Sequence, residues 1–132
     1  MNFFENTGVK AVVVACNTSS AVAYEAIRNK FKFRIYPIIQ CSSKVLANSN
    51  VKKLGIFATL ATIKSGVYQR EIHKYNSNIE LNGIGCSNWT NYVEYGKMQT
   101  EECYKDIDEI MKEMLSFNPE KIVLGCTHYP YL

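Results

Sequence analysis

Short apolar runs rich in β-branched residues alternate with amphipathic stretches along the chain, and this alternation constrains the fold more than any other feature. Five runs have the length and composition of strands, at residues 9–15, 34–39, 52–58, 79–85 and 121–125. Strands that alternate with helices form parallel sheets with helices packed on their faces. The sequence therefore predicts an α/β fold with a mainly parallel sheet and flanking helices.

The segments between these runs predict the helices. N-cap candidates at 17–20 begin a helix that runs toward Phe31. Further helices are predicted at 42–47, 62–74, 88–95 and 100–117. Pro37 interrupts the second strand. The first strand, at 9–15, is almost continuously apolar, which predicts burial on both of its faces.

Composition excludes several other classes of protein. With 132 residues, 47% hydrophobic and 20% charged, the chain is expected to fold around one compact core. Its longest apolar runs, at 11–16 and 35–39, are far shorter than the roughly 20 residues that span a bilayer. The first residues lack the basic and apolar regions of a signal peptide. We therefore expect a cytoplasmic protein that makes no use of a membrane.

Charge is unevenly distributed between the two halves of the chain. Residues 1–66 carry nine Lys and Arg against two Glu, a net charge of +7, whereas residues 67–132 carry six against ten acids, a net charge of −4. The basic residues cluster at 28–34, where they flank the end of a predicted helix and interact favourably with its dipole. No nucleic-acid partner is predicted from this pattern.

The cysteines indicate chemistry rather than cross-linking. Five cysteines form an odd set with no C-x-x-C pair and no zinc-ligand spacing, so neither disulfides nor a metal site is expected. Cys16 and Cys126 each follow a predicted strand and precede polar residues, in segments that resemble an internal repeat. Ligands of parallel α/β proteins bind beyond such strand ends, and a nearby helix start lowers the pKa of a thiol.

Two such thiols suit one particular reaction. Inverting the α-carbon of an amino acid requires two acid/base groups on opposite sides of that carbon, each with a pKa near the working pH. The Asn, Thr and His residues that follow the thiols, with main-chain N–H groups, could hold a carboxylate and stabilise developing negative charge. This chemistry requires no metal, cofactor or prosthetic group. The alternative is that both cysteines are buried structural thiols.

Two segments carry a family resemblance. The sequences V-A-C-N-T-S-S at 14–20 and L-G-C-T-H-Y-P at 124–130 closely resemble the two signatures of cofactor-independent glutamate racemases. Between these two segments, residues 55–62 together with Ser65 and Tyr68 are similar to the family's A-T-x-G-T stretch. Residues 92–94 are similar to the family's V-E segment. The resemblance implies a partial two-lobed aspartate/glutamate racemase fold, with a remnant of the first lobe at 1–36, most of the second at 37–132, and the cleft between them.

The resemblance also implies roles for individual residues. Cys16 and Cys126 would be the two catalytic proton donors and acceptors, serving opposite enantiomers of glutamate, with His128 assisting Cys126. The residues that would bind the substrate are Asn17, Thr18, Thr62, Thr127 and His128. Glu94 would orient His128 from behind. The implied activity is the interconversion of L- and D-glutamate, which supplies D-glutamate for peptidoglycan, cell-wall formation and cell shape, in an enzyme that forms homodimers in the family.

Several family features are absent from this sequence. The D-S-G-x-G-G loop and a later Tyr-Gly pair supply substrate contacts in the family, and neither occurs here. Ala61 stands at a usual glycine, and P-I-I-Q-C-S at 37–42 replaces G-V-I-E-P-G. About half of the usual enzyme is therefore expected, truncated at both ends. The alternatives are a related aspartate, hydantoin or other amino-acid racemase, and an inactive folded fragment or binding module.

Overall fold

The computed structural model describes all residues from 1 to 132 and contains eight α-helices, five strands and one 3-10 helix. The strands are β1 (Ala11–Val14), β2 (Arg34–Pro37), β3 (Lys53–Ala58), β4 (Glu80–Gly85) and β5 (Lys121–Gly125). The helices are α1 (Asn2–Asn6), α2 (Asn17–Val22), α3 (Tyr24–Ile27), α4 (Ile38–Ala47), α5 (Leu60–Lys64), α6 (Val67–His73), α7 (Trp89–Glu94), α8 (Glu101–Ser116) and the 3-10 helix η1 (Tyr129–Tyr131).

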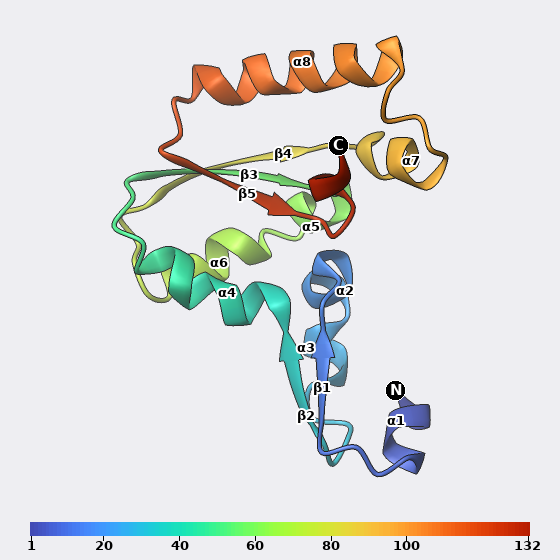
Figure 1. The fold of residues 1–132 in the computed structure, drawn as a ribbon. Helices are drawn as coiled ribbons and strands as arrows, with labels where there is room; N and C mark the ends of the chain where they lie inside the picture. The colour runs from blue at the N-terminus through green and yellow to red at the C-terminus, as the bar shows by residue number, and fades with distance from the viewer.

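The strands form two separate sheets in which every pairing is parallel. β1 pairs with β2, and the second sheet has the order β4-β3-β5. In Figure 1 the β1–β2 pair projects below the three-stranded sheet together with α1, α2 and α3. The predicted α/β class, with parallel strands and flanking helices, is confirmed.

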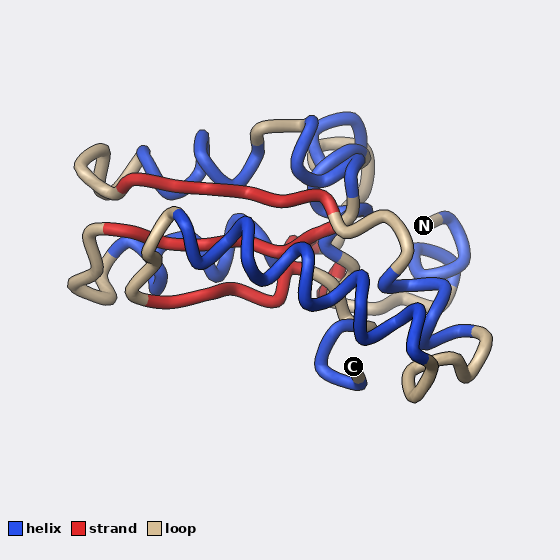
Figure 2. Tube along the Cα trace, turned by 90° about the horizontal axis from the view of Figure 1, so that it is seen from above, coloured by secondary structure: helices blue, strands red, loops and turns tan.

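The three-stranded sheet has a hydrophobic core on each face, because successive side chains of its central strand point to opposite sides. Leu54 and Ile56 belong to the core shared with α4 and α6, whereas Phe57 belongs to the core shared with α7 and α8. Figure 1 shows α8 on one side of this sheet and α4 and α6 on the other, and Figure 2 shows the strands running side by side between helices. The sheet is therefore the rigid support for the loops at its carboxyl edge.

The first strand differs from the sequence-based expectation. Burial of β1 on both faces is wrong, because its residues alternate between exposed and half-buried and the side chain of Val13 is 68% exposed. An apolar run makes a strand suitable for burial, but burial also requires another element to cover each face of the strand. No helix of this chain covers Val13, so this face of β1 is exposed.

Two helix boundaries were predicted incorrectly. The strand predicted at 34–39 ends at Pro37, and α4 begins directly at Ile38 rather than at Ser42. Pro37 has the extended backbone of a helix N-cap. The backbone N–H of Ile38, which has no partner within the helix, donates a hydrogen bond to the Ser20 hydroxyl at 3.1 Å. The helix predicted at 62–74 is divided into α5 and α6 by Gly66, whose φ of 63° is left-handed.

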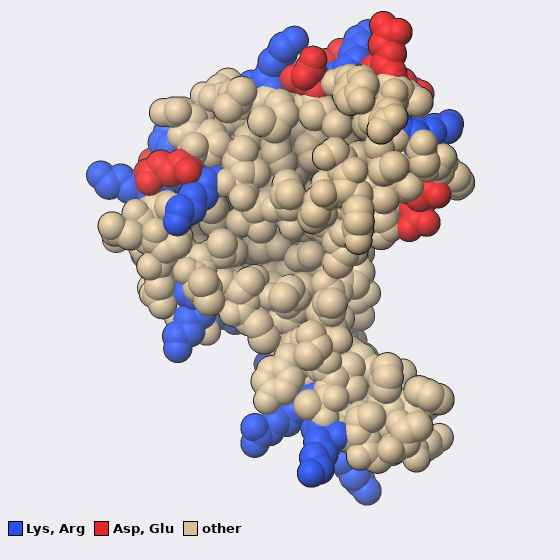
Figure 3. Space-filling model, viewed as in Figure 1, with Lys and Arg blue, Asp and Glu red and all other residues tan.

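The helix predicted toward Phe31 is also shorter than expected. It forms two short pieces, α2 and α3, that meet at Ala23 and end at Ile27. None of the helices in this chain combines the length and apolar character needed to cross a membrane. Figure 3 shows Lys and Arg side chains on the lower projection and acidic side chains concentrated toward the top of the molecule.

Candidate active site

A cavity of about 210 Å³ lies beyond the carboxyl ends of four strands from the two sheets. Its walls come from the segments that follow β1, β3, β4 and β5, so residues more than a hundred positions apart in the sequence meet there. The lining residues are Cys16, Asn17, Thr18, Thr59, Thr90, Cys126, Thr127 and His128. Both thiols thus line one cavity, as their placement after parallel strands predicts.

Cys16 is the N-cap of α2. Its sulfur accepts a hydrogen bond from the backbone N–H of Ser19 at 3.4 Å, and its side chain is exposed to solvent. Partial burial raises the pKa of this thiol, but hydrogen bonds from Ser19 and Thr18 outweigh that effect, so the pKa lies below its ordinary value. Because the thiolate is the reactive form of a cysteine, the turn raises the reactive fraction of Cys16 at neutral pH.

Cys126 follows β5 and is paired with a histidine. Its sulfur lies 3.6 Å from Nδ1 of His128, and Nε2 of His128 lies 2.5 Å from Oε1 of Glu94. An ionised carboxylate only accepts hydrogen bonds, so Nε2 is the donor to Glu94. In the tautomer with its hydrogen on Nε2, Nδ1 can accept a hydrogen bond from the Cys126 thiol or from the Thr127 hydroxyl, which lies 3.5 Å away. Thr90 contributes a hydroxyl 3.9 Å from the same sulfur.

Three threonine hydroxyls form a cluster beside Cys16. The hydroxyl of Thr18 lies 2.8 Å from that of Thr59 and 3.3 Å from that of Thr62, and the last two are 2.9 Å apart. Thr59 is also the N-cap of α5 and accepts from the backbone N–H of Thr62. The cluster therefore connects the turn that carries Cys16 to the carboxyl end of β3.

The structure brings most of the predicted site residues to this cavity. Thr62 is an exception, because it is buried and reaches the cavity only through Thr18 and Thr59. Glu94 lies outside the lining and contacts His128. Thr59 and Thr90 were not predicted as site residues. Thr59 directly follows the predicted strand at 52–58, which was a usable signal, whereas Thr90 lies within the predicted helix at 88–95.

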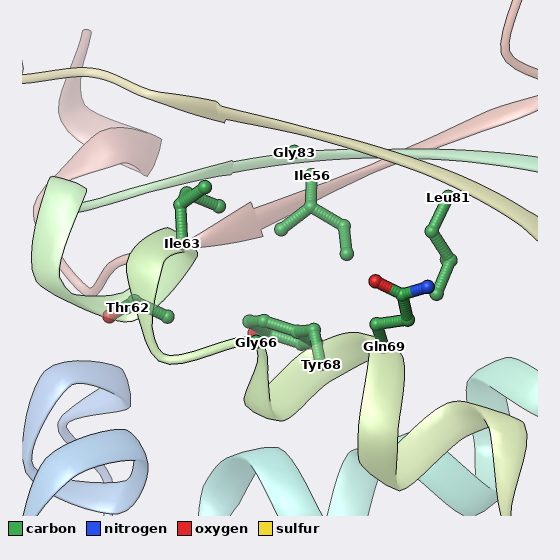
Figure 4. Close-up of a pocket in the computed structure, with 8 residues that line it drawn as sticks. All are labelled: Ile56, Thr62, Ile63, Gly66, Tyr68, Gln69, Leu81 and Gly83. Carbon is green, nitrogen blue, oxygen red and sulfur yellow. The ribbon is translucent and has the colours of Figure 1, made fainter.

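A second cavity, of about 230 Å³, lies between α5, α6 and the paired strands β3 and β4. Figure 4 shows Ile56, Ile63 and Leu81 on its walls, with the Tyr68 ring on the side opposite Ile56. Tyr68 and Thr62 line this second cavity and bond to Asn17 and Thr18 of the first. The two cavities are therefore connected through buried polar contacts.

The chain thus combines a parallel α/β fold with a cavity at its strand ends that is lined by two thiols and a histidine. The family model for Asp/Glu/hydantoin racemases matches residues 2–132. The chain belongs to this family, which confirms the resemblance of its two cysteine motifs.

Individual relatives agree with this assignment. Glutamate racemase from Aquifex aeolicus is 36% identical over 99% of this chain, which covers 51% of the relative. The crystal structure of glutamate racemase from Francisella tularensis with D-glutamate matches with a TM-score of 0.81 and 33% identity, over 97% of this chain and 48% of that one. The crystal structure of glutamate racemase from Campylobacter jejuni matches with a TM-score of 0.85 and 28% identity, over 98% of this chain and 52% of that one. The chain thus spans about half the length of these relatives.

We expect the five thiols to differ in their reaction with iodoacetamide at pH 7. Cys16 will be modified early, because it is exposed and its lowered pKa increases the thiolate fraction. Cys86 and Cys103 will be modified last, because burial hides both from the reagent and raises the pKa of both, that of Cys86 to about 12. Peptide mass spectrometry over time measures each rate, and urea, the control, should remove the difference. Equal rates in the folded protein would contradict this.

Proposed function

We propose that this chain carries the two acid/base thiols of a racemase that interconverts L- and D-glutamate. The observation that carries the proposal is that Cys16 and Cys126 line the same cavity. The glutamate racemases to which the chain is similar support glutamate as the substrate. The chain spans about half of those relatives, so the activity of the 132 residues is itself part of the proposal.

The proposed reaction moves one proton to each side of the α-carbon. A thiolate on one side takes the α-hydrogen, so that the C–H bond breaks, an S–H bond forms, and the electron pair stays on carbon and its carboxylate. The thiol on the other side then gives its proton to the opposite face and becomes the thiolate. Exchange with solvent restores both groups, and no external oxidant or cofactor is consumed.

Cys16 and Cys126 would start from opposite enantiomers. The Ser19 and Thr18 contacts of Cys16 favour its thiolate, and these contacts support its role as a base. His128 would accept the proton of Cys126 at Nδ1, and Glu94 would hold the ring in the required tautomer. Each thiol would thus have its own means of gaining and losing a proton.

The polar lining would bind the substrate. Asn17, Thr18 and Thr127 line the cavity and would donate hydrogen bonds to the glutamate carboxylates. His128 also lines the cavity and would donate to the substrate from Nδ1 once that nitrogen carries a proton. Thr62 would act through Thr18 and Thr59 rather than by direct contact, since it is bonded to both.

The wider biological setting is part of the same proposal. Residues 1–36 would belong to a first lobe and 37–132 to a second, a division supported by the two separate sheets. The enzyme would work in the cytoplasm as a homodimer and supply D-glutamate for peptidoglycan.

A circular-dichroism assay of D-glutamate conversion tests the proposal on the 132-residue chain, with D-aspartate and a substituted hydantoin as competing substrates. Inversion of D-glutamate above the other two supports it, and faster inversion of another substrate would assign the chain to a related racemase. Absence of activity that is recovered when a relative's D-S-G-x-G-G segment is restored would identify a folded fragment. Absence of activity in both proteins would overturn the proposal.

A further inference from the structure

We infer that Tyr68 is a positioning residue whose hydroxyl fixes the turn of Cys16 relative to the turn of Cys126. The consequence for catalysis rests on the proposed function, whereas the effect on the geometry of the turns does not. Tyr68 lies on α6 and does not line the cavity that contains the thiols. It therefore acts through the residues that it contacts.

The Tyr68 hydroxyl reaches the first turn directly. It donates a hydrogen bond to Oδ1 of Asn17 at 2.7 Å, and both side chains are buried. Asn17 is the first residue of α2 and follows Cys16 in the chain. Burial raises the pKa of Tyr68 to about 12, so the phenol stays protonated and remains a donor at neutral pH.

The same hydroxyl lies against the second turn. A methyl group on Gly125, the residue before Cys126, would come within 3.2 Å of the Tyr68 oxygen and 2.9 Å of the backbone oxygen of Phe57. A side chain at position 125 would therefore meet the backbone of Phe57 first and would also crowd the phenol of Tyr68. The glycine allows one hydroxyl to lie between the two thiol-bearing turns.

Packing alone does not account for the position of the ring. One side of Tyr68 faces the second cavity, which has a volume of about 230 Å³, so the ring has open space beside it (Figure 4). Without the hydroxyl, the ring could move into that space. The hydrogen bond to Asn17 is what holds its polar end between the two turns.

The experiment measures the turn and the reaction separately, with Tyr68→Phe. Loss of the bond frees Asn17 and loosens the first turn of α2, which weakens the contacts from Ser19 and Thr18 that favour the Cys16 thiolate. We expect alkylation of Cys16 by iodoacetamide at pH 7 to slow about threefold and its pH midpoint to rise. The other titratable side chains on this cavity are Cys126 and His128. We expect kcat for glutamate racemisation to fall about tenfold, because the thiols are misplaced.

Further variants make the test decisive. Gly125→Ala should also slow Cys16 alkylation, because its methyl group would crowd the phenol, and Gly125→Ala combined with Tyr68→Phe separates this effect from the contact with the Phe57 backbone oxygen: the double variant should be no slower than Tyr68→Phe. Tyr129→Phe is the matched control: it removes a buried phenol that donates to the carbonyl of Cys86 at 3.1 Å, and Cys16 alkylation should stay unchanged. Wild-type alkylation in both folded Tyr68→Phe and Gly125→Ala would overturn the inference. An inactive wild-type chain would count against the proposed function alone, since alkylation still reports on the turn.

Discussion

Replacement of either cavity cysteine by alanine will lower the rate of glutamate racemisation by about 10²- to 10⁴-fold, the usual contribution of a positioned acid or base. Each direction of the reaction uses one thiol to remove the proton and the other to return it, so Cys16→Ala and Cys126→Ala should both block inversion. Circular dichroism measures the loss, in the 132-residue chain or in the version with the restored D-S-G-x-G-G segment.

Exchange in D₂O refines this prediction. With one thiol removed, the other can still exchange the α-hydrogen of the enantiomer that it serves, without inverting it. Cys16→Ala and Cys126→Ala should therefore retain exchange with opposite enantiomers of glutamate. Cys41→Ser is the control, because Cys41 is an exposed thiol on α4 outside the cavity, and it should keep full activity. Full activity in either alanine variant would rule out the two-thiol reaction.

Hydrophobic patterning was sufficient to predict the parallel α/β fold, because a strand and a helix differ in the period of their apolar residues. The run at 121–125 corresponds to β5 without change. The element boundaries at Pro37 and Gly66 were harder to predict from the sequence. Apolar residues continue past both positions, so the pattern hides a change that depends on single backbone angles and on the distant hydroxyl of Ser20.

Site residues could be predicted from the sequence where the reactive side chain belongs to a short sequence motif. Cys16 and Cys126 were singled out by their position after strands together with the family resemblance of their motifs, and the structure places both on one cavity. Thr90 carries no comparable local signal, and the family-like stretch that includes Tyr68 does not indicate what the Tyr68 side chain contacts. Their relevance comes from tertiary contacts, at 3.9 Å to the Cys126 sulfur and 2.7 Å to Asn17, which join segments that are far apart in sequence.

Phe57→Ala is expected to lower the free energy of unfolding by about 3–5 kcal/mol, the cost of removing a buried aromatic side chain and leaving a cavity. Phe57 is only 2% exposed, and its ring centroid lies 5.0 Å from that of Trp89. It belongs to the same core as Met114 of α8, so it joins β3 to the helices on that face. Urea denaturation followed by far-ultraviolet circular dichroism measures the change.

Leu115→Ala is the matched control for this stability prediction, since Leu115 lies on α8 but is 59% exposed, and its loss should change stability by less than about 0.5 kcal/mol. A small effect of Phe57→Ala would show that β3 does not depend on this core.

The large effect has a consequence for the site, because Thr59 follows β3 one residue beyond Ala58 and bonds to Thr18. Partial unfolding of this core in Phe57→Ala would therefore also expose the cavity, and Cys126 should become more reactive toward iodoacetamide in sub-denaturing urea.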